Sequence, residues 1–221
     1  MKKQGLQLMT TLLLAVFYIT TSHAQGSKGL EGFQGVIEFT KATTFDTTSY
    51  VYYVKGDMIR IDEITSDKKI AGILIVNTKT YKSTSLSPDR QVYMELKSGN
   101  SNLITIKDVE IIKGKQTKTI AGYKCKEVVV KNKEQNTQIT YYLAKDNFHF
   151  FEGMLLALNR KDKFSTYFQQ LSDVQNTFPF RAIETDLNGK ARGSLNVVKV
   201  TKKDIEDYLF EIPDGYTKFE K

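Results

Sequence analysis

The sequence has few of the residues on which catalytic and metal sites most often depend. Its 221 residues include one cysteine, two histidines and no tryptophan. A single cysteine excludes a disulfide within the chain, so stability must come from packing. His23 lies in a segment that we expect to be removed, which leaves His149 as the only histidine. A nucleophilic site that needs an imidazole would have to use His149, and a zinc site would have at most one histidine and one cysteine.

Other chemical patterns are missing as well. The sequence has no glycine-rich phosphate loop, no histidine-rich metal spacing and no nucleophile elbow. The adjacent carboxylates Asp62 and Glu63 point to opposite sides of a strand, so they cannot easily act on one atom. We therefore expect a protein that is not an enzyme and that holds no metal and no cofactor. An enzyme would require a polar cluster around His149.

The first 24 residues have the features of an export signal. Lys2 and Lys3 precede an apolar stretch over residues 12–19, and Ser22-His23-Ala24 places small residues at the two positions that signal peptidase inspects. We predict cleavage after Ala24. No cysteine stands directly after that site to receive a lipid anchor, and no later stretch approaches the ~20 consecutive apolar residues of a membrane span. We expect a soluble protein of the periplasm or outer envelope of a Gram-negative-type bacterium.

The remaining chain is the size of one domain. We expect a flexible segment over residues 25–32 and a single domain over 33–221. The formal net charge falls from +7 to +5 when Lys2 and Lys3 leave with the signal. Nucleic acid is not an expected partner of an exported protein. The positive charge either favours anionic lipid surfaces or comes from lysines that protect strand edges from aggregation. The densest run comprises Lys113, Lys115, Lys118, Lys124, Lys126, Lys131 and Lys133.

Apolar residues alternate with polar ones along most of the chain, as in strands with one buried face. Such strands are expected around residues 33–41, 50–54, 59–61, 73–76, 80–85, 91–96, 124–132, 137–146 and 178–202, with one or two more over 102–114. Gly56 and Asn188-Gly189 provide the positive φ that tight hairpin turns require. The pattern predicts a mainly β (α+β) fold with an antiparallel sheet of about ten strands.

One segment has a different period. In residues 147–173, apolar side chains recur every three or four positions, which predicts one or two short helices. A further helical turn is expected near residues 203–207. The sheet needs a cover over its apolar face, and the helices are the available cover.

The apolar and aromatic side chains of the sheet and helices either fill a core or line a ligand cavity, because a curled sheet can enclose more space than two small helices fill. The candidate ligand-binding residues are Tyr52, Ile61, Val92, Met94, Phe151, Met154, Leu155, Leu158, Phe164 and Phe168. Arg60 lies two residues from Asp62 on the same strand face. It either pairs with that carboxylate or presents its guanidinium to an anionic head group.

Several stretches resemble known proteins. "YYVKGDMIRID", "ILIVNTKTYKSTSLSPDRQVYMEL" and "YLFEIPDGYTKFE" are similar to segments of periplasmic lipoprotein carriers, the LolA-like and outer-membrane lipoprotein-sorting proteins. "TIAGYKCKEVVV", "FPFRAIETD" and "FEIPDGY" more closely resemble an exported bacterial family catalogued as a domain of unknown function. The resemblance spans roughly residues 33–218. The carriers usually open with a helix, whereas "QGSKGLEG" here is glycine-rich.

The resemblance implies an unclosed, curved antiparallel sheet, or half-barrel, with a short helical lid on its concave face. It also implies that the protein holds a lipid or the acyl chain of an acylated protein, as carrier or sensor in the cell envelope. We expect the protein to be a monomer. An outer-membrane or envelope protein and the membrane surface are further expected contacts. The alternative is a structural or interaction module of the envelope whose core is filled by its own side chains. Cys125, at the start of a strand, is expected to be a small, partly buried side chain or to have a redox or intermolecular role.

Overall fold

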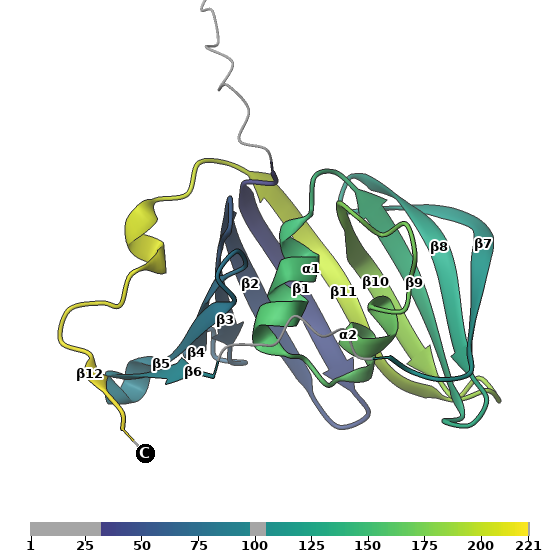
Figure 1. The fold of residues 1–221 in the computed structure, drawn as a ribbon, viewed down its shortest axis with the longest axis horizontal. Helices are drawn as coiled ribbons and strands as arrows, with labels where there is room; N and C mark the ends of the chain where they lie inside the picture. The colour runs from purple at the N-terminus through teal and green to yellow at the C-terminus, as the bar shows by residue number, and fades with distance from the viewer. Residues whose placement is uncertain (1–31, 98–104, 221) are drawn as a thin grey trace, which may run out of the picture.

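The computed structural model describes residues 32–97 and 105–220 (Figure 1). The predicted signal peptide, its cleavage site and residues 25–31 of the predicted flexible segment lie outside the described residues. The described residues form twelve strands, two α-helices and two short 3₁₀ helices. In chain order these are β1 (Gly35–Thr43), β2 (Thr47–Lys55), β3 (Met58–Ile64), β4 (Ile70–Asn77), β5 (Lys82–Ser87), η1 (Pro88–Arg90), β6 (Val92–Leu96), β7 (Val109–Ile120), β8 (Tyr123–Asn132), β9 (Thr137–Lys145), α1 (Phe150–Leu158), α2 (Lys163–Phe168), β10 (Thr177–Thr185), β11 (Ala191–Lys202), η2 (Asp207–Phe210) and β12 (Thr217–Lys218).

All twelve strands belong to one sheet, in the order β12-β6-β5-β4-β3-β2-β1-β11-β10-β9-β8-β7. Every pairing is antiparallel except that of β12 with β6. β7 and β12 stand at opposite ends of this order and do not pair with each other, so the sheet is not closed. The predicted fold class, mainly β with an unclosed sheet and few helices, is confirmed to this extent.

The strand count is twelve where alternation predicted about ten. β12 has only two residues, too few to show a period. It is attached to β6 by backbone hydrogen bonds, from Thr217 N–H to the Gln91 carbonyl at 3.0 Å and from Phe219 N–H to the Tyr93 carbonyl at 2.8 Å. The outer edge of β7 pairs with no strand among the described residues.

Turn residues explain why two predicted hairpins agree with the structure and why one strand begins later than predicted. Gly56 and Gly189 have φ values of +56° and +86°, so both predicted hairpin turns are confirmed. β5 begins at Lys82, two residues after the predicted start. The side-chain oxygen of Asn77 accepts hydrogen bonds from the backbone N–H groups of Lys79 and Thr80, which holds this segment in a turn.

The two helices lie over one face of the sheet, in front of β1, β11 and β10 (Figure 1). The predicted helical segment is confirmed as α1 and α2. A helix of this kind must bury its apolar stripe, and α1 buries Phe150, Phe151, Met154, Leu155 and Ala157. Gly153 lets α1 approach Thr78, the residue after β4, because a Cβ atom at position 153 would lie 2.8 Å from the Cβ of Thr78.

Aromatic rings fill much of the space between the helices and the sheet. Five other aromatic rings have their centroids within 6.4 Å of the ring centroid of Phe178 on β10. Its neighbours are Tyr52, Phe148, Phe150, Phe151 and Phe180. The interpretation of the alternating aromatics as core residues is therefore correct for this part of the sheet.

The chain after β11 packs against the sheet where Ile73, Ile75 and Leu86 form a second, smaller apolar cluster with Phe210 and Tyr216. The predicted helical turn near residues 203–207 is wrong in position, because η2 begins at Asp207. Residues 203–206 are not helical, and Ile205 among them is buried in the core.

Candidate functional site

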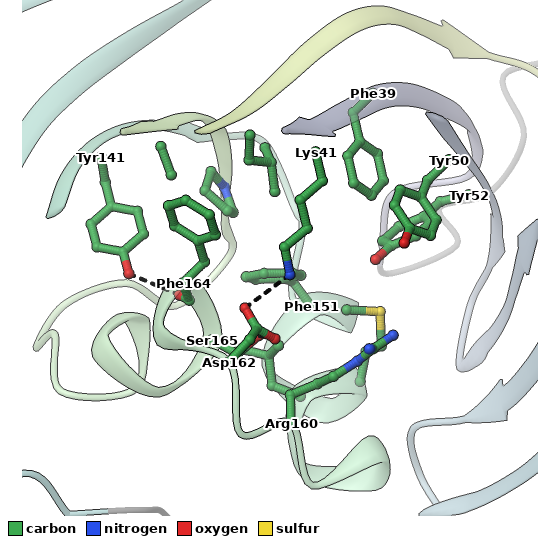
Figure 2. Close-up of a pocket in the computed structure, with 15 residues that line it drawn as sticks. Phe39, Lys41, Tyr50, Tyr52, Tyr141, Phe151, Arg160, Asp162, Phe164 and Ser165 are labelled. Atoms are coloured by element: carbon green, nitrogen blue, oxygen red, sulfur yellow. Dashed lines mark hydrogen bonds and ion pairs between the residues drawn. The ribbon is translucent and has the colours of Figure 1, made fainter. Parts of the chain in front are cut away.

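A small cavity lies between the helices and the sheet. Its volume is about 60 Å³. Strands β1 and β2, helix α1, the α1–α2 loop and the start of α2 provide most of its walls (Figure 2). The lining residues are Phe39, Lys41, Tyr50, Tyr52, Tyr141, Phe151, Met154, Leu155, Arg160, Asp162, Phe164, Ser165, Pro179, Ala182 and Leu195.

The end of α1 places two charged residues at this cavity. Asn159 terminates the helix in the left-handed conformation (φ 46°, ψ 47°), and its backbone N–H bonds to the carbonyls of Leu155 and Leu156. Asparagine tolerates this conformation better than most residues. The chain then turns so that Arg160 and Asp162 line the cavity (Figure 2).

Asp162 is held by two partners. Its Oδ1 lies 3.2 Å from Lys41 Nζ, and its Oδ2 accepts a hydrogen bond of 2.9 Å from the Ser165 hydroxyl. Burial raises the pKa of Asp162, but Lys41, Ser165 and Arg160 together outweigh burial and hold that pKa below its ordinary value. The carboxylate is therefore ionised at neutral pH and neutralises Lys41.

Arg160 differs from its neighbours. In the described part of the chain, no acceptor lies within ion-pair or hydrogen-bond distance of its guanidinium. Burial raises the pKa of Tyr52 to about 12, so this phenol stays neutral. The charged side chains lining the cavity are Lys41, Arg160 and Asp162, which sum to one positive charge.

An open groove adjoins the cavity on the side of β3, β4 and β5. It encloses about 250 Å³ and shares Tyr50 and Arg160 with the cavity. Ile61 pairs with Leu74, and Leu74 pairs with Ser85, so these three side chains form a row across the strands. Small side chains at Ser85 and Gly72 leave the groove open. The lining residues are Tyr50, Ile61, Glu63, Gly72, Ile73, Leu74, Ser85 and Arg160.

The row continues to a second hollow at the β5–β6 end of the sheet. Ser85 pairs with Met94, and Ser87 pairs with Val92. This hollow encloses about 200 Å³ between Ser85, Ser87, Arg90, Val92, Tyr93, Met94 and Phe219. Ser85 lines both the groove and this hollow.

The structure divides the ten predicted ligand-binding residues among these sites. Five line the cavity, namely Tyr52, Phe151, Met154, Leu155 and Phe164. Ile61 lines the groove, while Val92 and Met94 line the second hollow. Leu158 and Phe168 pack in the core and are not among the residues that line the cavity.

Arg60 does not join this set. It makes two hydrogen bonds to Asp62, Nε to Oδ1 at 2.7 Å and Nη2 to Oδ2 at 3.2 Å, and Nη1 donates to the Leu209 carbonyl at 3.3 Å. Neighbouring residues of a strand alternate between its faces, so Arg60 points away from the face that carries Ile61. The structure thus shows Arg60 paired with Asp62, which was the alternative to a role in binding a head group. Arg60 also lies on the opposite face of β3 from the candidate Ile61.

Cys125 is fully buried, and its thiol donates to the Tyr123 carbonyl at 3.3 Å. Burial raises the pKa of the thiol to about 11. A buried, protonated thiol is a poor nucleophile, so Cys125 acts as a small core side chain. His149 is exposed at the start of α1, and its ring lies against Gly32.

Three lysines of the dense lysine run lie on the edge strand of the sheet, and Lys124, Lys126 and Lys131 lie on its neighbour β8. Lys113, Lys115 and Lys118 belong to edge strand β7, and they are exposed. Lysines on an edge strand discourage pairing with other chains, which supports their interpretation as protection against aggregation.

Sequence reasoning missed Lys41, Arg160 and Asp162. Lys41 has the same parity on β1 as Ile37 and Phe39, so alternation alone could have placed it on the covered face. Arg160 and Asp162 lie in a polar loop with no periodic signal, and only the turn at Asn159 brings them to the cavity.

Within residues 32–97 and 105–220, no group of three His, Cys, Asp or Glu residues is arranged to hold a metal ion. None of the described helices is both long and apolar enough to cross a membrane.

Fold and site together define a mainly β protein with an open sheet, a two-helix cover and an apolar groove beside it. The chain belongs to the DUF4412 family, a domain of unknown function that matches residues 33–216. No curated protein matches the sequence.

Solved structures share parts of the architecture. An uncharacterised conserved protein from Thermus thermophilus is 9% identical, with a TM-score of 0.49, 84% of this chain covered and 90% of that chain. MucB in the Pseudomonas aeruginosa MucA/MucB complex is 9% identical, with a TM-score of 0.43 and coverages of 81% and 54%. A putative outer-membrane lipoprotein-sorting protein domain from Vibrio parahaemolyticus is 10% identical, with a TM-score of 0.33 and coverages of 83% and 91%. At these scores the likenesses carry no argument about function.

Proposed function

We propose that this protein binds a hydrophobic or amphiphilic ligand, such as a lipid or a lipoprotein acyl chain, in the cell envelope without catalysing a reaction. The observation that carries the proposal is the open groove over β3, β4 and β5, with Ile61 and Leu74 on its floor and small side chains at Gly72 and Ser85. Location in the envelope follows from the predicted export signal. The half-barrel curvature of the sheet, and a monomer with peripheral membrane contact, belong to the same proposal.

The ligand lies beside the helices rather than beneath them. Ligand pockets commonly enclose about 300–1,000 Å³, and the cavity of about 60 Å³ under α1 and α2 is far smaller. The groove of about 250 Å³ and the second hollow of about 200 Å³ are both larger than this cavity, and Ser85 lines both of them. Burial stabilises each methylene by about 0.8 kcal/mol, so eight buried methylenes contribute about 6 kcal/mol before ordering costs.

A substitution that fills the groove tests the proposal. Ser85→Phe places a ring between Leu74 and Met94, its cross-strand neighbours. Val198→Phe is the control, because Val198 is exposed on β11 and lines neither the groove nor the second hollow. Displacement of the neutral dye N-phenyl-1-naphthylamine by dodecanoate should weaken at least tenfold in Ser85→Phe and remain unchanged in Val198→Phe. Equal displacement in both variants, or no dye bound by the natural protein, would contradict the proposal.

A second candidate function is a structural or interaction module of the envelope. The dense aromatic packing around Phe178 favours it, because the space beneath the helices is filled by the chain itself. Gently purified protein that repeatedly carries no lipid in native mass spectrometry, and whose melting does not respond to added lipids, would favour this candidate over the first.

A further inference from the structure

We propose that the ligand is an anionic amphiphile whose carboxylate or phosphate head group binds the guanidinium of Arg160, where the cavity meets the groove. This inference rests on the proposed function and names the chemical class of its ligand. Arg160 lines both spaces, so a head group bound there leaves the tail free to follow the groove.

Arg160 is available for an external anion. The carboxylate among the residues that line the cavity is Asp162, which already pairs with Lys41 and accepts a hydrogen bond from Ser165 (Figure 2). The surplus positive charge of the cavity therefore resides on Arg160. A guanidinium presents a planar fork of donors that matches a carboxylate or phosphate with two parallel hydrogen bonds.

The backbone of Arg160 is fixed before any ligand arrives. The C-cap at Asn159 bonds to two carbonyls of α1, and the Arg160 N–H bonds to the Leu155 carbonyl at 3.4 Å. A donor on a backbone held in this way loses less freedom on binding than one on a mobile loop.

The volumes of the two spaces match the two ends of an amphiphile. A cavity of about 60 Å³ has room for a few water molecules or one small head group, since one water needs roughly 10–15 Å³ on this measure. It cannot accept an acyl chain. The groove and the second hollow have apolar walls at Ile61, Leu74 and Met94 and are several times larger.

Glu63 adds a negative charge to the groove, opposite Tyr50 on the neighbouring strand. It lines the groove but not the cavity, and it is exposed. An anionic head group is repelled near Glu63 and attracted near Arg160. The tail follows the uncharged row from Leu74 past Ser85 to Met94.

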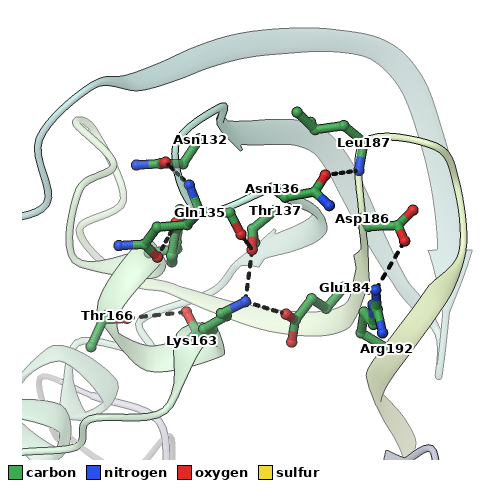
Figure 3. Close-up of polar contacts among 11 residues, drawn as sticks. Asn132, Gln135, Asn136, Thr137, Lys163, Thr166, Glu184, Asp186, Leu187 and Arg192 are labelled. Atoms are coloured by element: carbon green, nitrogen blue, oxygen red, sulfur yellow. Dashed lines mark hydrogen bonds and ion pairs between the residues drawn. The ribbon is translucent and has the colours of Figure 1, made fainter.

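Two other cations, Lys163 and Arg192, are held by internal bonds. Lys163 bonds to Thr137 and Glu184, and Arg192 bonds to Asp186, so neither cation is open to a ligand (Figure 3). Arg90, which lines the second hollow, makes no such bond to a described residue either, but it is exposed, whereas Arg160 is half-buried where the cavity meets the groove.

The experiment compares two probes with the same chain and different head groups, dodecanoate and dodecanol, by displacement of N-phenyl-1-naphthylamine. The natural protein should prefer dodecanoate. Arg160→Gln should weaken dodecanoate binding by about 10- to 100-fold and leave dodecanol binding unchanged. Glu63→Gln, a matched removal of the opposite charge in the same groove, should strengthen dodecanoate binding. Circular dichroism and melting check that both variants fold.

The outcomes separate the two claims. If the natural protein binds both probes equally, or if Arg160→Gln keeps the preference for dodecanoate, the groove binds amphiphiles but the assignment of Arg160 is wrong. If neither probe binds, the proposed function fails and this inference fails with it. Acetate provides the head group alone, and displacement by acetate as effective as by dodecanoate would also overturn the inference.

Discussion

The aromatic core around Phe178 permits a quantitative prediction for the substitution Phe178→Ala. Phe178 is 1% exposed, and its ring contacts five other rings with centroid distances of 4.8–6.4 Å. Truncation of a buried phenylalanine costs about 3–5 kcal/mol, because transfer free energy is lost and a void remains. Each aromatic pair adds about 0.5–1.5 kcal/mol beyond its buried area. With five pairs lost, we expect the upper part of that range, about 4–5 kcal/mol.

The measurement is urea unfolding followed by circular dichroism. A loss of 4–5 kcal/mol should also lower the melting temperature by about 8–20 °C, given about 2–4 °C per kcal/mol for a domain of this size. Phe45→Ala is the matched control, because the same substitution removes a ring that is 97% exposed in the β1–β2 loop. The control should change the free energy of unfolding by less than about 0.5 kcal/mol.

A loss below about 1.5 kcal/mol for Phe178→Ala would refute the reasoning. It would mean that the space beneath the helices is loosely filled, and the ligand could then lie there rather than in the groove. A large loss for Phe45→Ala would show that exposure does not decide the outcome.

Three further substitutions or treatments have definite expected results. Gly153→Ala gains about 0.5–1 kcal/mol of helix propensity but brings a Cβ atom to 2.8 Å from Thr78, so we expect the free energy of unfolding to fall by about 1 kcal/mol in chemical unfolding. A rise in that free energy would show that α1 can move away from Thr78. The pKa of Asp162 is lower in the folded state than its ordinary value of 3.8, so the stabilisation from its carboxylate is present above pH 3.8 and is lost as the pH falls below 3.8. The difference in free energy of unfolding between the natural protein and Asp162→Asn should therefore shrink from pH 7 to pH 3. A difference that stays constant with pH would contradict this linkage. The Cys125 thiol, with its pKa raised to about 11, should react with a disulfide reagent at pH 8 only after unfolding in urea, and rapid native reaction would contradict its burial.

Much of the sheet could be predicted from the sequence because alternation and turn chemistry are local. Gly56 and Asn188-Gly189 fixed two hairpins, and the change of period after residue 147 separated the helices from the strands. β12 could not be found in this way, since two residues show no alternation and the pairing partner lies far away in the chain.

The candidate site was predictable only in part. Tyr52, Phe151 and Met154 were found because their faces are periodic, and they do line one cavity. Whether that cavity is large or nearly filled depends on rings contributed by β10 and the segment before α1, which no local pattern reports. Arg160 escaped for the same reason, because its position depends on the turn at Asn159.

The two ends of the sheet differ in what they offer to a second molecule. β7 exposes the outer edge of a 12-residue strand among the described residues, whereas at the other end the two-residue β12 pairs with Val92 and Tyr93 of the five-residue β6. Growth of a fibre by backbone pairing needs two long, complementary strand edges on every subunit. If two copies paired through β7, neither would have another long unpaired strand edge among the described residues. Self-association by this route therefore ends at a dimer and does not form a polymer.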